Sequence, residues 1–95
     1  MVILRLEHTA PNYEEWKKIF DSDPIDRKQS GVKHYRIYRA VEDPNHVVME
    51  FEFNTLTEAQ KVLNALDDFW EKTAGSIIIN PTIHLFDIVE SIDLN

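Results

Sequence analysis

Cysteine is absent from this chain of 95 residues, which has two glycines and fewer basic than acidic residues. Without cysteine there is no disulfide framework, no thiolate nucleophile and no cysteine-ligated zinc or iron–sulfur site. Two glycines are too few for a glycine-rich loop that cradles nucleotide phosphates. The 10 Lys and Arg against 17 Asp and Glu give a formal charge of −7. That balance argues against nucleic acid and against an anionic membrane surface as partners.

Long apolar runs are missing as well. No segment approaches the roughly 20 apolar residues that span a bilayer, and the first residues lack the basic stretch and apolar core of a secretion signal. Hydrophobic residues make up 43% of the chain and charged residues 28%, which is ordinary for a globular protein. We therefore expect one acidic, cytoplasmic domain over residues 1–95. Its core should be thin, because so short a chain buries only about two-thirds of its unfolded surface.

Hydrophobic periodicity divides the chain into strands and helices. Strands are predicted over residues 2–8, 32–41, 46–53 and 82–89, the middle two forming a hairpin across a Pro-Asn turn. Helical spacing of apolar residues predicts one helix over 13–20, preceded by Asn12, a residue that favours helix entry. A second helix should start at the capping-box pair Thr55 and Glu58 and end at Ala74 and Gly75. A further short helical piece over 25–30 should end at Gly31, and 76–81 is expected to be a linker.

The resulting order, βαββαβ, predicts a fold of the α+β class. It is the ferredoxin-like arrangement, a four-stranded antiparallel sheet with two helices on one face and strand order 4-1-3-2. The face turned away from the helices is expected to mix charged and apolar side chains, among them Ile3, Arg5, Glu7, Val48, Glu50 and Glu52. Such a face suits packing against the sheet of a second copy, which predicts a homodimer through the sheet face. The alternative is a monomer with an amphipathic open face.

Several segments, in this order and spacing, resemble a known superfamily. They are a first strand that ends in His8, Asn12-Tyr13-Glu14-Glu15-Trp16-Lys17-Lys18-Ile19-Phe20-Asp21, Gly31-Val32-Lys33-His34-Tyr35-Arg36-Ile37-Tyr38-Arg39, Asp43-Pro44-Asn45-His46-Val47-Val48, Phe51-Glu52-Phe53 and Leu56-Thr57-Glu58-Ala59. Together they resemble the dimeric α-β barrel superfamily, and within it the antibiotic-biosynthesis monooxygenase domain and its uncharacterised cyclase-like relatives.

This resemblance implies a homodimer whose sheets meet face to face, with a pocket between sheet and helices in each copy. Some relatives oxidise aromatic polyketides without metal or flavin, some cyclise them and some bind haem. For this chain it implies cofactor-independent oxygenation or cyclisation of a small apolar, aromatic or polyketide-like ligand. The contrasting hypothesis is a non-catalytic ligand-binding or dimerisation module. We expect no cofactor.

The candidate site lies where the first strand meets the first helix. His8, on the helix-facing side of its strand, is the candidate catalytic base or hydrogen-bonding group, since a histidine is neutral near pH 7. The commoner arrangement is a strand-end histidine bonded to a backbone carbonyl. Asn12, Tyr13 and Trp16 are the candidate pocket residues, although aromatic residues in a helix stripe are more often core. A cavity of about 300 Å³ lined by His8 would favour ligand binding.

The other histidines and the charged residues of the open sheet face suggest structural roles and not catalysis or metal binding. His34, His46 and His84 are spread over three predicted strands without metal-ligand spacing, so no metal site is predicted. Glu50 and Glu52 share a face with Arg5 and Glu7. The carboxylates either form an acid–base pair or belong to an ion-pair network that fixes the register between two sheets. We favour the ion-pair network.

Overall fold

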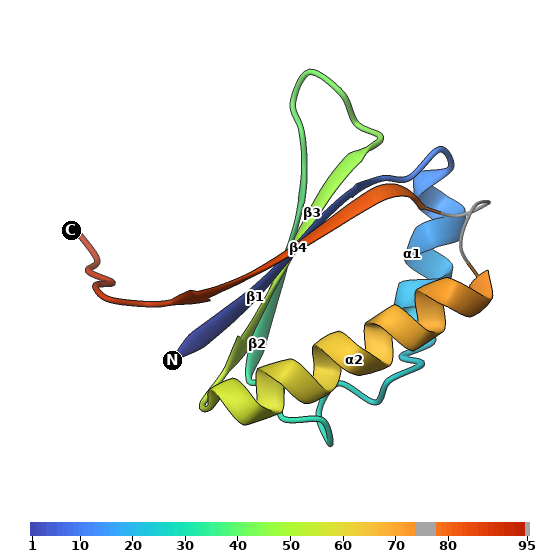
Figure 1. The fold of residues 1–95 in the computed structure, drawn as a ribbon. Helices are drawn as coiled ribbons and strands as arrows, with labels where there is room; N and C mark the ends of the chain where they lie inside the picture. Colours follow the sequence, from blue (N-terminus) through green and yellow to red (C-terminus); the bar gives the residue numbers. More distant parts are fainter. Residues whose placement is uncertain (74–77, 95) are drawn as a thin grey trace.

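The computed structural model describes residues 1–73 and 78–94. Within them the chain forms strands and helices in the predicted order βαββαβ, shown in Figure 1. Their bounds are β1 Val2–Thr9, α1 Tyr13–Asp21, β2 His34–Arg39, β3 His46–Phe53, α2 Leu56–Thr73 and β4 Ile79–Asp87. In the described part of the chain no helix is long and apolar enough to cross a membrane.

The four strands form one antiparallel sheet in the order β2-β3-β1-β4. This is the strand order that the ferredoxin-like prediction requires, with the hairpin partner β2 and the last strand at the two edges. Both helices lie on one side of the sheet in Figure 1, so the other face has no covering element from the described chain. The α+β, ferredoxin-like fold class is therefore confirmed.

The core lies between the sheet and the helices. Burial alternates along β1, where every second residue from Val2 to His8 is buried, because strand side chains point to opposite faces in turn. β3 contributes Phe51 opposite Leu4 in the register. The helices supply residues at helical spacing, which include Trp16, Phe20, Val62 and Leu66. The periodicity in the sequence thus predicted which side of each element is buried.

Both helices begin at the predicted capping residues. The Asn12 side chain accepts a hydrogen bond from the backbone N–H of Glu15 at 3.1 Å. At α2 the Thr55 hydroxyl accepts from the Glu58 N–H at 3.2 Å and donates to the Glu58 carboxylate at 3.1 Å. These side chains satisfy backbone donors that have no partner within a helix.

The short helix predicted over 25–30 is wrong: this segment is a series of turns. Asp23 and Asp26 have φ values of 58° and 53°, and such left-handed residues break a right-handed helix at each occurrence. Gly31 does have the expected positive φ, 98°. A Cβ at Gly31 would lie 2.6 Å from the Glu58 Oε2, so a larger residue would be strained by its backbone conformation and would also displace the Glu58 side chain.

The outer strands differ from prediction at their ends. β2 is shorter than the predicted 32–41, because pairing with β3 covers only the stretch opposite Val47 to Glu52. β4 begins at Ile79, inside the predicted linker, and stops at Asp87 instead of residue 89. Val2 pairs with Asp87 and a single further bond joins the Ile88 N–H to the Met1 carbonyl, so β4 ends where its partner ends. The predicted helix end at Ala74 and Gly75 lies outside the described residues.

Candidate functional site

His8 lies at the end of β1, on the face covered by the helices. Its side chain is almost completely buried, with 1% of the residue exposed. Its ring centroid lies 5.4 Å from that of Trp16 in α1 and 6.5 Å from that of Trp70 near the end of α2. Trp16 in turn contacts Phe20, with ring centroids 5.4 Å apart. The strand therefore places one imidazole against a row of aromatic rings contributed by both helices.

Neither ring nitrogen of His8 has a hydrogen-bond partner within residues 1–73 and 78–94. No bond to a backbone carbonyl meets hydrogen-bond geometry among the described residues, although the Thr9 backbone interacts with the ring and opposes part of the effect of burial on the pKa of His8. Burial lowers the pKa of His8 below its ordinary value of 6.5, because an imidazolium is disfavoured away from water. At neutral pH the ring is therefore uncharged, with one N–H donor and one acceptor nitrogen. Unpartnered buried polar atoms are rare in folded proteins and call for an explanation.

The sheet is irregular beside His8. The pairing of β1 with β4 passes from Glu7 opposite Thr82 to Thr9 opposite Ile79, so Asn80 and Pro81 both lie opposite His8. Asn80 has a φ of 54°. This extra residue is a β-bulge, a feature that re-aims side chains and is frequent beside active sites. In the sequence this bulge lies at the end of the segment 76–81, which was expected to be a linker.

The predicted pocket residues occupy different environments. Trp16 is buried at the site. Asn12 is exposed and its side-chain oxygen caps α1. Tyr13 is half-buried, its ring 5.6 Å from that of Trp16 and covered by the Arg39 guanidinium at 4.0 Å. Asn12 and Tyr13 thus flank the aromatic row at the start of α1.

An apolar cavity of about 50 Å³ lies between the helices and the sheet. It is lined by Trp16, Ile19, Phe20, Pro24, Ile25, Arg27, Met49, Phe51, Leu66, Phe69, Trp70 and Ile78. The volume is enough for a few water molecules and is well below the roughly 300 Å³ of a small-molecule pocket. His8 is not among the lining residues, although both indoles that contact it are. A ring-sized ligand would therefore reach His8 after the side chains around the cavity move apart.

Two lining residues had little signal in the sequence. Trp70 belongs to the apolar stripe of α2, and only its tertiary contact with His8 distinguishes it from the core residues of that stripe. Arg27 lay in the segment predicted as a short helix. Its guanidinium stacks over the Phe20 ring at 4.0 Å, a contact that depends on the turns that replace that helix.

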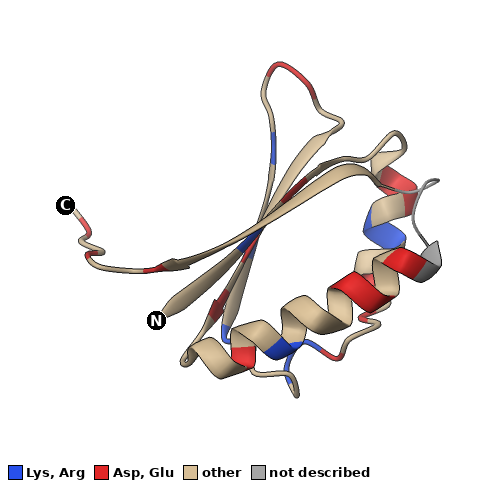
Figure 2. Cartoon of the chain, viewed as in Figure 1, with Lys and Arg blue, Asp and Glu red and all other residues tan. Residues whose placement is uncertain are grey.

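The face of the sheet away from the helices carries paired charges. Glu50 accepts a hydrogen bond from the Tyr38 hydroxyl at 2.9 Å, and its carboxylate lies 3.9 Å from the Arg5 guanidinium. The Glu7 carboxylate lies 2.6 Å from His46 Nε2. Figure 2 shows basic and acidic segments interleaved along the strands, whereas acidic residues gather along the later part of α2. These contacts agree with the ion-pair interpretation of Arg5 and Glu50.

Among the described residues there is no group of three or more His, Asp or Glu arranged to hold a metal ion. An open groove of about 450 Å³ at the end of β1 is lined by Glu7, His8, Thr9, His46, Asn80 and Thr82. By the register of β1 and β3, this groove lies on the sheet face opposite the apolar cavity.

Comparison with known proteins identifies which proteins share this fold. No protein-family model and no curated protein sequence matches the chain. Solved structures do match it, over nearly their whole length. The chain has the ferredoxin-like fold of antibiotic biosynthesis monooxygenases and of dimeric ferredoxin-like proteins, as the sequence resemblance predicted.

Three matching structures show the range of proteins with this fold. SnoaB, a cofactor-independent oxygenase from Streptomyces nogalater, is 14% identical and has a TM-score of 0.76, with 95% of this chain and 94% of SnoaB covered. MhuD, crystallised as a variant with two manganese protoporphyrin IX molecules per active site, is 15% identical and has a TM-score of 0.74, with 98% and 99% covered. A dimeric ferredoxin-like protein from an uncultured marine organism is 14% identical and has a TM-score of 0.68, with 96% and 97% covered. At these identities the likeness establishes the fold, and function has to be argued from the site.

Proposed function

We propose that this chain forms a homodimer in which each copy binds a small aromatic or polyketide-like molecule between helices and sheet. We further propose that it catalyses cofactor-independent oxygenation or cyclisation of that molecule, with His8 as the base. The observation that carries the proposal is the buried imidazole of His8, which has no hydrogen-bond partner among the described residues and contacts Trp16 and Trp70 beside the apolar cavity.

The chemistry follows from the state of the imidazole. A neutral His8 accepts a hydrogen bond from a phenolic or enolic hydroxyl of the ligand, which supplies the partner that the protein lacks. Transfer of that proton leaves an imidazolium on the protein and an oxyanion on the ligand. An electron-rich oxyanion of this kind reacts with dioxygen in an oxygenase or with a carbonyl group of the same molecule in a cyclase. The indole of Trp16 packs against the flat ligand and excludes water from it.

Native mass spectrometry of protein purified gently from a cell lysate tests the dimer and the ligand in one measurement. We expect a dimer mass together with a retained small molecule in wild type, and a dimer without that molecule in His8→Leu. A wild-type dimer that carries no added mass, and that shows no change in tryptophan fluorescence with 1-naphthol, would contradict the ligand proposal. A retained mass equal to haem, with a Soret band, would assign the cavity to haem instead of an aromatic substrate.

The uncovered face of the sheet supports the homodimer. It exposes Phe86 and Tyr38, at 49% and 41%, beside the Glu50 carboxylate and its Arg5 partner. Apolar side chains interspersed with paired charges suit an interface between two identical sheets. Arg5→Ala should weaken the dimer, because Glu50 would then be buried in the interface without its cation. Sedimentation velocity at micromolar concentration checks this, and an unchanged dimer fraction would contradict the proposed face.

A non-catalytic ligand-binding or dimerisation module is the second candidate. The small volume of the cavity and the separation of His8 from it by two indoles favour this alternative. The two candidates differ in the fate of a bound ligand. An enzyme releases a changed molecule that mass spectrometry detects after incubation, whereas a binding module returns the same molecule.

A further inference from the structure

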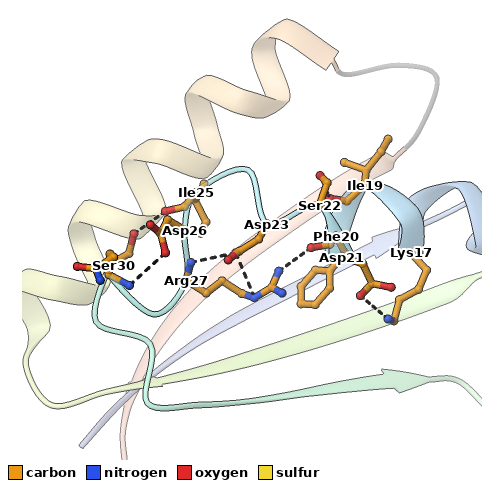
Figure 3. Close-up of polar contacts among 11 residues, drawn as sticks. Lys17, Ile19, Phe20, Asp21, Ser22, Asp23, Ile25, Asp26, Arg27 and Ser30 are labelled. Carbon is orange, nitrogen blue, oxygen red and sulfur yellow. Dashed lines mark hydrogen bonds and ion pairs between the residues drawn. The ribbon is translucent and has the colours of Figure 1, made fainter.

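Among the described residues that line the apolar cavity, Arg27 is the one with a charged side chain. It lies in the series of turns between α1 and β2, shown in Figure 3, and its side chain is 15% exposed. A cation beside a cavity of indole, phenyl and aliphatic groups is unusual, since charged groups are costly to bury unless they are paired. Its position therefore suggests a role in selecting what enters the cavity.

The guanidinium is held in one place by several contacts. It lies 4.0 Å from the centroid of the Phe20 ring and 5.0 Å from that of Tyr35. Its Nη1 donates to the Phe20 carbonyl oxygen at 2.6 Å, and its Nε lies 3.5 Å from Asp23 Oδ1. Asp23 also accepts from the Arg27 backbone N–H at 2.9 Å, as drawn in Figure 3. A planar cation fixed in this way loses little conformational entropy when it binds a ligand.

Donors remain on the side chain after these contacts are counted. A guanidinium has five N–H donors, and Nη1 and Nε are the nitrogens with partners in the described chain. Nη2, with two donors, has no partner within residues 1–73 and 78–94. Adjacent N–H groups of a guanidinium form a fork that matches the two oxygens of a carboxylate.

We propose that Arg27 is an anion subsite of the cavity, so that the ligand is an aromatic molecule whose ring enters among Trp16, Phe20 and Trp70 while its carboxylate binds the guanidinium. This inference rests on the proposed function, because it assumes an aromatic ligand in that cavity. The inference specifies the chemical class of the ligand, aromatic carboxylates, and identifies Arg27 as the residue that discriminates among aromatic ligands. Asp23 competes with the ligand for the same cation.

Phenylacetate and phenylacetamide are the probes that test it. They have almost the same shape and differ in charge at neutral pH. The two tryptophans of the chain, Trp16 and Trp70, both line the cavity, so tryptophan fluorescence reports binding directly. We expect phenylacetate to bind about tenfold more tightly than phenylacetamide, the size of a hydrogen bond to a charged group compared with a neutral one.

Three variants test whether Arg27 itself causes the preference for phenylacetate. Arg27→Gln should remove the preference for phenylacetate and leave the affinity for phenylacetamide within about twofold. Lys28→Gln, which removes the same charge from the exposed neighbouring residue, should keep the preference. Asp23→Asn should tighten binding of phenylacetate, because it removes the competing carboxylate, while asparagine tolerates the left-handed backbone at this position.

The outcomes distinguish this inference from the proposed function. Equal affinity of wild type for the two probes, or a preference that survives Arg27→Gln, would overturn the anion subsite and leave the aromatic cavity in place. No fluorescence response to either probe would overturn both. The test holds even if Arg27→Gln is unstable. The comparison of the two probes in wild type does not need that variant, and neither does the gain in affinity expected for Asp23→Asn.

Discussion

Replacing His8 by leucine should make the protein more stable. The two side chains have similar volumes, so leucine fits the same space without a large cavity or clash. The change removes a buried donor and a buried acceptor that lack partners, and leaving such a group unpaired costs about 1–3 kcal/mol. It also loses the ring contacts with Trp16 and Trp70, worth about 0.5–1.5 kcal/mol each. The net expectation is a gain of about 1 kcal/mol at pH 7.5.

The gain should grow as the pH falls. Burial holds the native pKa of His8 below 6.5, so below that pH the unfolded chain binds a proton that the native protein does not. Wild type therefore loses stability as the pH falls through 6.5, by up to about 1.4 kcal/mol per pH unit. The leucine variant lacks this loss. The difference between the two proteins should be larger at pH 5.5 than at pH 7.5.

Urea unfolding followed by tryptophan fluorescence, at both pH values, measures these free energies. Thermal unfolding should show a rise in Tm of about 4–8 °C for each kcal/mol in a chain of this length. Gln60→Leu, which places a leucine at an exposed position of α2, is the control for adding an apolar side chain at the surface. A leucine variant that is less stable than wild type by the same amount at both pH values would refute the reasoning, because His8 would then have a hydrogen-bond partner.

Three further substitutions test the packing and the local geometry. Phe51→Ala, at a core position with 1% exposure, should cost about 3–5 kcal/mol in urea unfolding, and a cost below 1 kcal/mol would contradict its core position. Gly31→Ala should cost about 1–3 kcal/mol from its positive φ and from the approach to Glu58; an unchanged Tm would show that the turn adapts. Asn12→Ala should lower the free energy of unfolding by about 1 kcal/mol through loss of the α1 cap. Asn12→Ser, measured by the same urea denaturation, should retain most of that stability.

The sequence predicted the fold well because most of its signals are local and agree with one another. Period-two alternation along β1 and β3 predicted the buried faces, and the caps Asn12 and Thr55 predicted where the helices begin. The prediction for segment 25–30 failed because Gly31, a usual helix terminator, suggested a helix before it, whereas the positive φ values of Asp23 and Asp26 accompany hydrogen bonds across a series of turns.

The candidate site was harder to predict, because its properties arise from contacts between distant segments. His8 could be placed on the buried face of its strand, but the lack of a partner for its nitrogens depends on what α1 and α2 bring to it. Trp70 is 62 positions from His8 in the sequence, and no pattern along the chain connects them. The stacking of Arg27 on Phe20 likewise depends on a turn that the sequence suggested was helical.

The irregular start of β4 bears on how copies of this chain associate at high concentration. β4 is an edge strand of the sheet, and exposed edges invite further strands to add and grow into fibrils. Pro81 has no N–H to offer an incoming strand, and Asn80 turns the backbone out of line with its left-handed φ of 54°. At the other edge β2 is only six residues long and ends in Arg39. Both edges therefore resist open-ended strand addition, which leaves the broad face of the sheet for the proposed homodimer, an assembly that would close after two copies.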